Sequence, residues 1–387
     1  MSGILEKISD AAKARFAEIP FPHRKDEYWR FADLSAWSAD ALFPHFSRGV
    51  PESREDSKIA EISANAQKNG LAVFDGQLLS ADVPVGVSVL SMSAAAEKYP
   101  EAVSEFFGAA KGKFDTIAAS RAQNGSVFVV DDGASAELEL SVISRLGLSA
   151  GSALFMLGRN SKLRLVRRFA TAGGSFGISM SGFLLSENSA LELATFKYSG
   201  AEAHTYLRDD FRVPAGAAVV DAYAEVGLSP SRAERNFEIT GGGAEIDTRA
   251  FLRTSGAITH DMRTSQMHRV GGSHSNLAVK CAVADKSRAA FAGLIRVEED
   301  AQKTSAYQSC RSLSLSDNAK TEASPMLEIL ANDVECSHGC TVSKPDSDEL
   351  FYMNQRGLSD SEALDLIIGG FARTTFEKFG MEFDGNC

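Results

Sequence analysis

The sequence predicts a mainly β protein. A parallel β-helix core is flanked by an N-terminal region of helices and short strands and by a C-terminal helical domain. Three observations predict this class. Short segments that alternate apolar and polar residues fill the chain from about residue 126 to 345, as is typical of half-buried strands. These segments recur at a nearly constant spacing, and helical periodicity returns after residue 345. We therefore expect three units, at residues 1–125, 126–345 and 346–387.

The N-terminal unit is predicted to be mostly helical. Its opening stretch places apolar side chains near helical spacing, namely Ile4, Leu5, Ile8, Ala12 and Phe16. Further helices are expected at 93–112 and 113–125. Two short apolar segments, "LAVFDG" at 71–76 and "VSVLSM" at 87–92, are expected to be strands.

The central unit is predicted to be a β-helix because its strands repeat at a nearly fixed period. Equivalent positions in successive segments are Leu163, Leu191, Val219 and Ile246. A constant period in this range, about 28 residues, marks a repeat architecture. One period holds two or three short strands, enough for one coil, and coils stack at about 4.8 Å. Asn-Gly hairpin turns, which would favour a sandwich, are absent from the repeats.

The C-terminal unit is predicted to contain two helices. The first is bounded by Asp346 or Ser347 and by Gly357, and the second begins with the capping box of Ser359 and Glu362. One face of the second helix is apolar and includes Leu364, Ile367, Ile368 and Phe371. This face either packs on its own domain or docks a partner subunit. Spacing alone favours neither.

Composition excludes several classes of function. The net charge is −11, from 40 basic and 51 acidic residues, which disfavours nucleic-acid binding. No apolar run approaches the roughly 20 residues that span a bilayer, and the N-terminus is too charged for a secretory signal. We therefore predict a cytoplasmic protein. The chain has no Walker A motif, and no ATP site is expected.

The five cysteines direct attention to the C-terminal third. Their odd number argues against a disulfide framework, and three of them cluster at Cys310, Cys336 and Cys340. On a strand, Cys336, His338 and Cys340 share one face. The outer two lie about 13 Å apart on an extended chain, which disfavours a permanent zinc site. A labile soft metal or a cluster could still be held transiently. The alternative is a set of inert core cysteines.

The repeat period adds Cys310 to this group. Cys310 precedes His338 by the same interval that separates Leu163 from Leu191, which is one coil. Cys310 and His338, or Cys310 and Cys336, are therefore expected on adjacent rungs, within about 5 Å at the backbone. A neighbouring imidazole would help Cys310 to hold its thiolate form.

Several ordered stretches together resemble the SufB/SufD family of iron–sulfur cluster assembly. They are "RKDEYWRFADL" at 24–34, "AQKT" at 301–304, "PMLEI" at 325–329, "CSHG" at 336–339 and "LFY…RGL" within 350–358. The resemblance is dense over residues 294–371 and thin between that stretch and the N-terminal one. It implies a right-handed parallel β-helix. Within the family "CSHG" looks like the SufD type, since the SufB type has glutamate where His338 stands.

The resemblance also implies a function. The chain would be a non-catalytic scaffold subunit that pairs with SufB through the β-helix and binds the ABC-type ATPase SufC through its C-terminal helices. A transient cluster of iron and sulfide would be built at the SufB–SufD interface, with sulfur from a separate cysteine desulfurase. The implied site residues are His338 as ligand or proton-transfer group, Cys336 and Cys310 as supporting thiols, and Cys340 as a further candidate. Leu364, Ile367, Ile368 and Phe371 would dock the partner.

Two departures from the SufD pattern keep alternatives open. Cys310 stands where the SufB type has its cysteine, and the usual leucine run reads "SLSLS". A SufB-like homodimeric scaffold is therefore one alternative. The others are a β-helix enzyme acting on polysaccharide, which would need paired carboxylates on a groove, and an interaction scaffold whose cysteines are inert.

Overall fold

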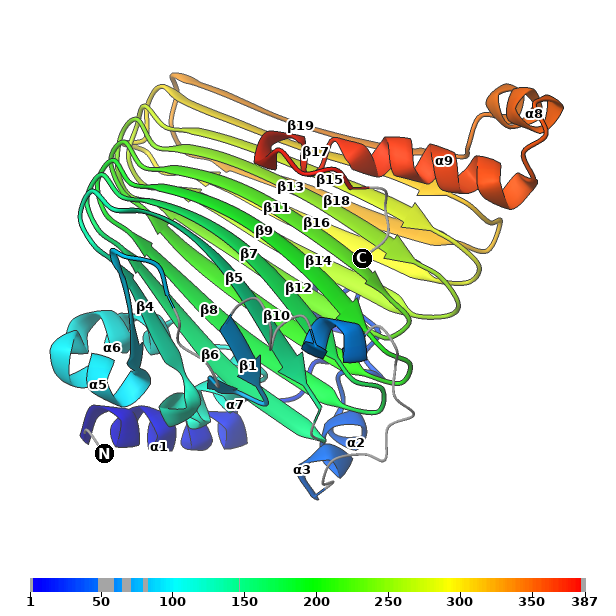
Figure 1. The fold of residues 1–387 in the computed structure, drawn as a ribbon. Helices are drawn as coiled ribbons and strands as arrows, with labels where there is room; N and C mark the ends of the chain where they lie inside the picture. The colour runs from blue at the N-terminus through cyan, green and yellow to red at the C-terminus, as the bar shows by residue number, and fades with distance from the viewer. Residues whose placement is uncertain (1–2, 48–58, 65–70, 79–82, 146, 384–387) are drawn as a thin grey trace.

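The computed structural model describes residues 3–47, 59–64, 71–78, 83–145 and 147–383. Strands make up 46% and helices 23% of the structure, and the core is a parallel β-solenoid of about 8 turns followed by a C-terminal helical segment. Figure 1 shows the N-terminal helices beside the first coils and α9 lying across the face of sheet A, with the last coils at the opposite end of the stack. The predicted fold class is confirmed.

Two sheets face each other across the interior of the solenoid, and each coil contributes one strand to each sheet. Sheet A consists, in spatial order, of β19 (Val334–Ser343), β17 (Thr304–Ser314), β15 (His274–Val283), β13 (Glu245–Thr254), β11 (Ala218–Gly227), β9 (Ala190–Ser199), β7 (Lys162–Thr171), β5 (Ser135–Ser144), β1 (Leu71–Phe74) and β2 (Gln77–Leu78). Sheet B consists of β18 (Lys320–Ile329), β16 (Arg288–Val297), β14 (Thr259–His268), β12 (Ser231–Ile239), β10 (His204–Val213), β8 (Phe176–Leu185), β6 (Leu148–Leu157), β4 (Ser126–Val130) and β3 (Val87–Ser91). Pairing is parallel except at β1–β2 and β3–β4.

The interior repeats from coil to coil because the register stacks equivalent residues. In sheet B a ladder of phenylalanine rings runs through successive coils with centroid separations of 4.7, 4.9, 4.6 and 4.4 Å. Its members are Phe128, Phe155, Phe183, Phe211 and Phe237. These spacings approximate the distance between strands, so each ring stacks on the ring of the coil before it.

The turns repeat as well. Asn160, Asn188, Gly216 and Gly243 all have a positive φ, between 56° and 70°. Each of these residues lies three positions before Leu163, Leu191, Val219 and Ile246 respectively. Asparagine and glycine tolerate this left-handed conformation better than other residues. The recurring turn residues therefore produce the period seen in the sequence.

The N-terminal helices cover the outer face of sheet B at its first coils (Figure 1). They are α1 (Gly3–Glu18), η1 (Glu27–Trp29), α2 (Ala39–Leu42), α3 (Pro44–Ser47), α5 (Met92–Lys98), α6 (Pro100–Gly108), α7 (Asp115–Ser120) and η2 (Ala122–Asn124). Residues 59–64 are also helical and pack on sheet A through Ile59. Trp37 and Phe114 pack edge to face, with 5.1 Å between centroids, and both contact Phe176 and Tyr206 of the sheet.

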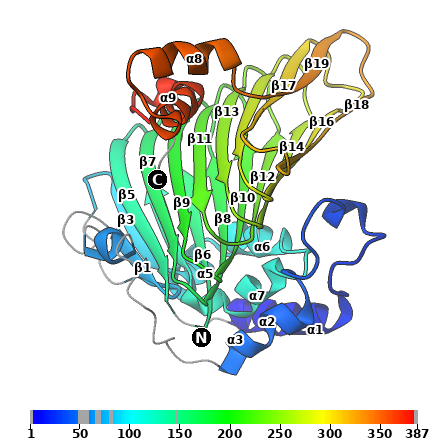
Figure 2. The ribbon, with the colours of Figure 1, turned by 90° about the vertical axis from the view of Figure 1, so that its right-hand side faces the viewer.

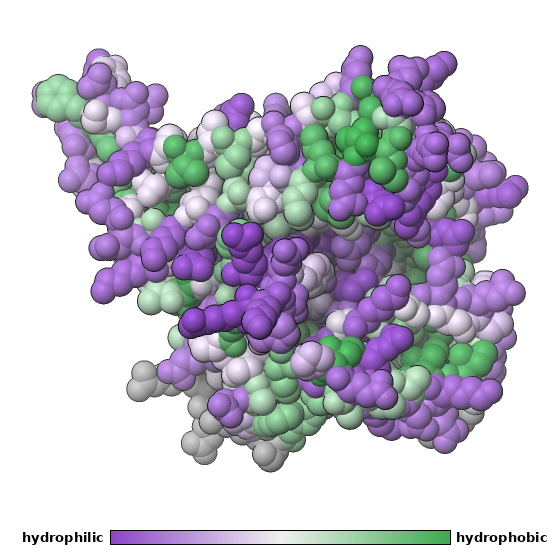
Figure 3. All heavy atoms as spheres, turned by 180° about the vertical axis from the view of Figure 1, so that it is seen from behind, coloured by the Kyte–Doolittle hydropathy of each residue, from purple (hydrophilic) through white to green (hydrophobic). Residues whose placement is uncertain are grey.

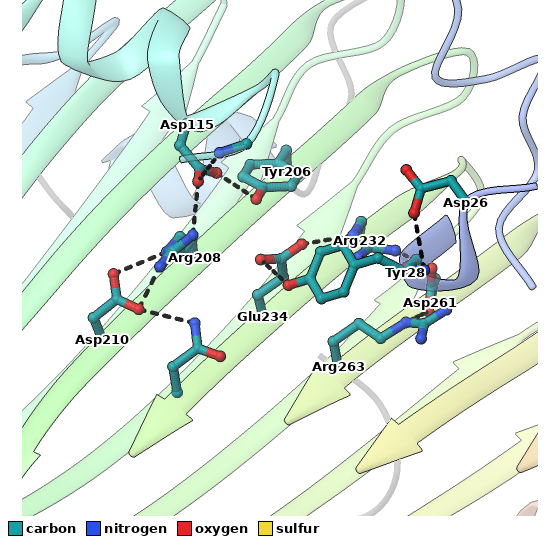
Figure 4. A network of polar contacts seen from close by, with 12 residues as sticks. Asp26, Tyr28, Asp115, Tyr206, Arg208, Asp210, Arg232, Glu234, Asp261 and Arg263 are labelled. Atoms are coloured by element: carbon teal, nitrogen blue, oxygen red, sulfur yellow. Dashed lines mark hydrogen bonds and ion pairs between the residues drawn. The ribbon is translucent and has the colours of Figure 1, made fainter. Parts of the chain in front are cut away.

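The motif at residues 24–34 anchors this N-terminal region to sheet B. Figure 4 shows Tyr28 reaching the outward-facing charged residues of the strands, and its hydroxyl donates to Glu234 at 2.7 Å. The guanidinium of Arg232 lies 3.8 Å from the centroid of the Trp29 ring and also pairs with Glu234 at 2.7 Å. The tyrosine and the tryptophan of the motif therefore have structural roles.

The C-terminal segment lies over the outer face of sheet A. It contains α8 (Ser347–Gln355), α9 (Asp360–Arg373) and η3 (Glu377–Phe379). Side chains of α9 and of the following segment pack on Val166, Ala194 and Ala222 of the sheet. In the part of the chain that the structure describes, no helix is long and apolar enough to cross a membrane.

Candidate functional site: the open end of the solenoid

The last coil, formed by β18 and β19, leaves one end of the solenoid uncovered (Figure 2). Most residues of β16 and β17 are buried, whereas no residue of β18 or β19 is buried. Among the described residues, β19 pairs on one side only, with β17. Repeat proteins normally protect such an end with a polar cap, and an open parallel edge is a template for association.

Apolar side chains are exposed around this open end. Met326 is 45%, Leu330 53% and Val342 57% exposed, and Tyr307 of the preceding coil is 41% exposed. Grouped exposed apolar residues mark interaction surfaces more often than isolated ones do. The end coil therefore has the character of an interface.

The predicted site residues of the sulfur-rich strand lie on this coil. Cys336, His338 and Cys340 alternate along β19 and pair with residues of β17 that face the interior, Ala306, Gln308 and Cys310 respectively. They therefore share the inner face. Cys340 and His338 are exposed, and Cys336 is partly buried. Cys336 packs against the small apolar cluster that includes Val297 and Ala306.

The register differs from the expected one by two positions. Cys310 pairs with Cys340, and His338 pairs with Gln308. The reason is that the coils lengthen toward the C-terminus. Ile246 pairs with Ser275, Ser275 with Ala306 and Ala306 with Cys336, and each of these intervals is longer than the one from Leu163 to Leu191. The predicted neighbours Cys310 and His338 lie on adjacent strands but not opposite each other.

Cys310 is instead the centre of a row of thiols. Cys281 of β15, Cys310 of β17 and Cys340 of β19 lie on three successive coils. Cys281 and Cys310 belong to one buried cluster, and both other thiols affect the pKa of Cys310. Cys281 and Cys310 are 0% and 1% exposed. The hydrogen bond with Cys281 and burial raise the pKa of Cys310, and burial also raises the pKa values of Cys336 and Cys340. The thiolate expected for Cys310 is therefore not favoured. Cys387 lies outside the described residues.

His338 is the accessible imidazole of the site. Its rung neighbour Gln308 is 3% exposed and donates from Nε2 to the carbonyl of Met326 at 3.1 Å. In the described parts of the chain no group of three or more His, Cys, Asp or Glu residues is placed to hold a metal ion. This face offers individual soft donors, so a coordination site here would need ligands from a second chain.

The interior of the middle coils, between β7 and β12, contains buried charged residues that were not predicted from the sequence. Arg167, Asp209, Arg235 and Asp221 are 0–1% exposed. Arg167 pairs with Asp209 at 2.6 Å, and Arg235 pairs with Asp209 at 2.7 Å and with Asp221 through two donors. Burial would raise the pKa of Asp209, but the two guanidinium groups outweigh it and lower that pKa.

A second buried ion pair links strands β9 and β11. Lys197 donates to Glu225 at 2.7 Å, and His260 approaches the same carboxylate at 3.7 Å. Burial opposes ionisation of Glu225, but Lys197 outweighs it and lowers its pKa to about 2. The signal for these residues was charge at inward positions of alternating strands, as in "ATFKYS" and "VVDAYAEVG".

The apolar face of α9 packs largely on the chain itself. Ile368 is 2% exposed and lies in the cluster on sheet A, and Phe371 packs at its edge. Leu364 and Ile367 are partly buried. The intramolecular alternative therefore describes this face better than docking does. The exposed apolar residues of the segment are Phe351 (65%), Tyr352 (59%) and Leu366 (58%). Hydrophobic spheres on the projecting α8 are visible in Figure 3.

The paired glycines in α9 line a groove. Gly369 and Gly370 face a hollow of about 1190 Å³ between α9, the outer face of sheet A and the segment at 381–383. A Cβ at Gly370 would meet nothing within 4 Å. The described part of the chain therefore leaves room for a side chain at this position.

The structure therefore defines a parallel β-solenoid whose last coil, among the described residues, is uncapped and presents thiols and an imidazole. The model of the family "SUF system FeS cluster assembly, SufBD core domain" matches residues 140–371, so the chain belongs to the SufBD family. It is 26% identical to "Protein ABCI7, chloroplastic" of Arabidopsis thaliana over 97% of this chain and 82% of that protein.

Two relatives carry the name SufD. Identity is 27% to the "Iron-sulfur cluster assembly protein SufD" of Escherichia coli strain K12, over 59% of this chain and 52% of that protein. It is 29% to the protein of the same name in Bacillus subtilis, over 38% and 34%. Together these matches place the chain with the SufD-type proteins of the SUF system of iron–sulfur cluster assembly.

Proposed function

We propose that this chain is a non-catalytic scaffold subunit that joins a SufB-type partner through its open last coil and contributes His338 to an iron–sulfur assembly site between them. The observation that carries the proposal is the uncapped end of the solenoid. A coil with exposed apolar side chains and a free strand edge is incomplete without a partner. The same coil presents the imidazole and the thiols.

Coordination chemistry supports the choice of ligands. Thiolate and imidazole groups suit iron and its clusters. His338 is exposed and can bind without prior rearrangement, and Cys340 lies two positions along the same face. Cys336 and Cys310 are more enclosed, so they serve as supporting thiols. Iron and sulfide are cargo in this scheme, held until a complete cluster leaves.

The C-terminal helices supply a second contact in this proposal. The residues on α8 and α9 that are exposed enough to bind a SufC-type ATPase are Phe351, Tyr352 and Leu366, rather than the buried Ile368. Nucleotide hydrolysis in that partner would act on the open end through the short connection from β19 to α8. The cytoplasmic location stays a prediction. Membership of the SufBD family favours this function over a polysaccharide-active enzyme.

The test is His338→Ala in the complex with its co-expressed partners. We expect loss of cluster formation, measured by visible absorbance and by bound iron and sulfide, with unchanged co-purification of the subunits. His274→Ala is the matched control, because His274 is also exposed but lies at the start of β15, two coils away. Normal cluster yield in the His338 variant, or equal loss in both variants, would refute the assignment. A SufB-like homodimer would appear as a two-chain assembly of this subunit alone.

A further inference from the structure

We propose that Cys340 and Cys310 form a reversible disulfide, which makes the open coil a site of thiol oxidation. The inference deepens the proposed function and rests on it only in part, because it adds a redox control to the same end of the solenoid. Its chemical test does not depend on cluster assembly. The argument starts from the placement of the two sulfur atoms and from their unequal exposure.

The register brings the two cysteines opposite each other. Cys310 of β17 pairs directly with Cys340 of β19, and side chains of paired residues in parallel strands project from the same face. Neighbouring strands lie about 4.8 Å apart, within the Cα separations of roughly 4.4–6.8 Å that disulfides span. Each of the two thiols affects the pKa of the other. Among the described residues β19 pairs only with β17, so it is free to make the small approach that the bond requires.

The two thiols differ in access, which sets the order of reaction. Cys340 is exposed and Cys310 is 1% exposed. A peroxide therefore oxidises Cys340 first, converting its thiol to a sulfenic acid with release of water. The Cys310 sulfur then attacks the sulfur of Cys340, the S–O bond breaks, and a second water leaves. The two thiols lose two electrons in total and the peroxide gains them. A small dithiol returns both cysteines to the reduced state.

The other cysteines of the region are less suitable partners. Cys336 lies opposite Ala306 and has no thiol across the rung. Cys281 contacts Cys310 but pairs with Ser312, and both of these thiols are enclosed, so neither gives an oxidant a point of entry. The structure therefore assigns the bond to Cys310 and Cys340.

The bond would change the site in two ways. It removes Cys340 from the set of soft donors beside His338, and it ties the last coil covalently to the one before it. Oxidation would thus withdraw a ligand from the assembly face while the fold stays intact. Reduction would restore the face without new synthesis of the protein.

The experiment is peptide mapping of the full chain after treatment with hydrogen peroxide and alkylation of the remaining thiols. Trypsin releases Cys310 in residues 304–311, Cys281 in 281–286, and Cys336 with Cys340 in 321–356. We expect the peptides 304–311 and 321–356 to be joined and to separate on reduction. Cys336→Ser should keep the link, and Cys340→Ser should abolish it. Circular dichroism of each variant checks that it is folded.

Other linkages would overturn the proposal. These are a bond between 281–286 and 304–311, a bond within 321–356, or irreversible oxidation of Cys340 without a link. In the assembled complex, peroxide should lower cluster yield, and subsequent reduction by a small dithiol should restore it. A link that forms while His338→Ala assembles clusters normally would leave the disulfide standing and refute only the proposed ligand.

Discussion

Replacement of Arg235 by methionine is expected to be among the most damaging single changes in the solenoid. The guanidinium of Arg235 lies between Asp209 and Asp221, and all three side chains are 0% exposed. Its loss leaves Asp209 with Arg167 but leaves Asp221 without its ion-pair partner. Removing one member of a buried ion pair costs about 3–5 kcal/mol, because an uncompensated charge remains in a low-dielectric interior. We expect the free energy of unfolding to fall by that amount.

A second substitution tests whether charge is the cause. In the double variant Arg235→Met/Asp221→Leu, the remaining pair of Arg167 and Asp209 is balanced, and the apolar side chains fill similar volumes. Exchange of a buried ion pair for apolar residues is often close to neutral, so the double variant should recover more than half of the loss. Burial already raises the pKa of Asp221, so in the single variant this carboxyl should take up a proton.

Urea unfolding followed by circular dichroism gives the three free energies of the cycle. Strong non-additivity is the expected outcome, with the double variant more stable than Arg235→Met alone. If the two substitutions simply add, or if Arg235→Met costs less than about 1 kcal/mol, the buried ion pairs do not stabilise the core as argued.

Three further changes probe the ladder, a buried histidine and the N-terminal anchor. Phe183→Ala, in the middle of the stacked rings, should cost about 3–5 kcal/mol in urea unfolding, with Tyr352→Phe on the exposed α8 as the neutral control. Burial first, and the nearby His45 second, lower the pKa of His204 to about 4. The folded protein therefore keeps His204 neutral at pH values where the unfolded chain protonates it. The free energy of unfolding is unaffected above the unfolded pKa of about 6.5 and decreases as the pH falls toward 4. Replacement by Phe should remove roughly 2 kcal/mol of that acid destabilisation, and an unchanged pH profile would contradict this. Tyr28→Phe removes one hydrogen bond to Glu234, which keeps its pairing with Arg232, and should cost about 1–3 kcal/mol, visible as faster proteolysis within residues 3–47.

The β-solenoid was predictable because its period is visible in the sequence. Residues such as Leu163 and Leu191 stack directly, with turn residues Asn160 and Asn188 at the same spacing. Stacked positions share the same environment, so similar residue types recur at the same spacing. The repeat in the sequence therefore predicts the fold. Coil length is set by the turns, however, and an extra residue there leaves the strand pattern unchanged.

That independence explains why the cysteines and His338 were expected on the right strands but in the wrong register. A constant period puts Cys310 opposite His338, whereas the longer last coil puts it opposite Cys340. The alternation of "AYQSCRS" and "VECSHGC" is the same in both registers, so it does not distinguish them. The interior charges were missed for a different reason. The alternation places Lys197 on the inward face, but a lysine is normally exposed, and its pairing with Glu225 one coil later, which allows its burial, is not visible in the local sequence.

The contrast along the solenoid axis supports a division of labour within one chain. The middle coils are held by stacked aromatic rings and by ion pairs that lose their compensation if any member moves. Such an interior resists deformation. In β18 and β19 no aromatic rings stack and the ion pair of Glu328 with Arg296 is exposed. These strands have no buried residue, and the rung partners of the inner face of β19 are small or polar groups and a thiol. The strand edge and donor atoms of the last coil can therefore respond to a partner or an oxidant while the middle coils keep their register. The proposed site requires this combination, because it receives iron and then releases a cluster.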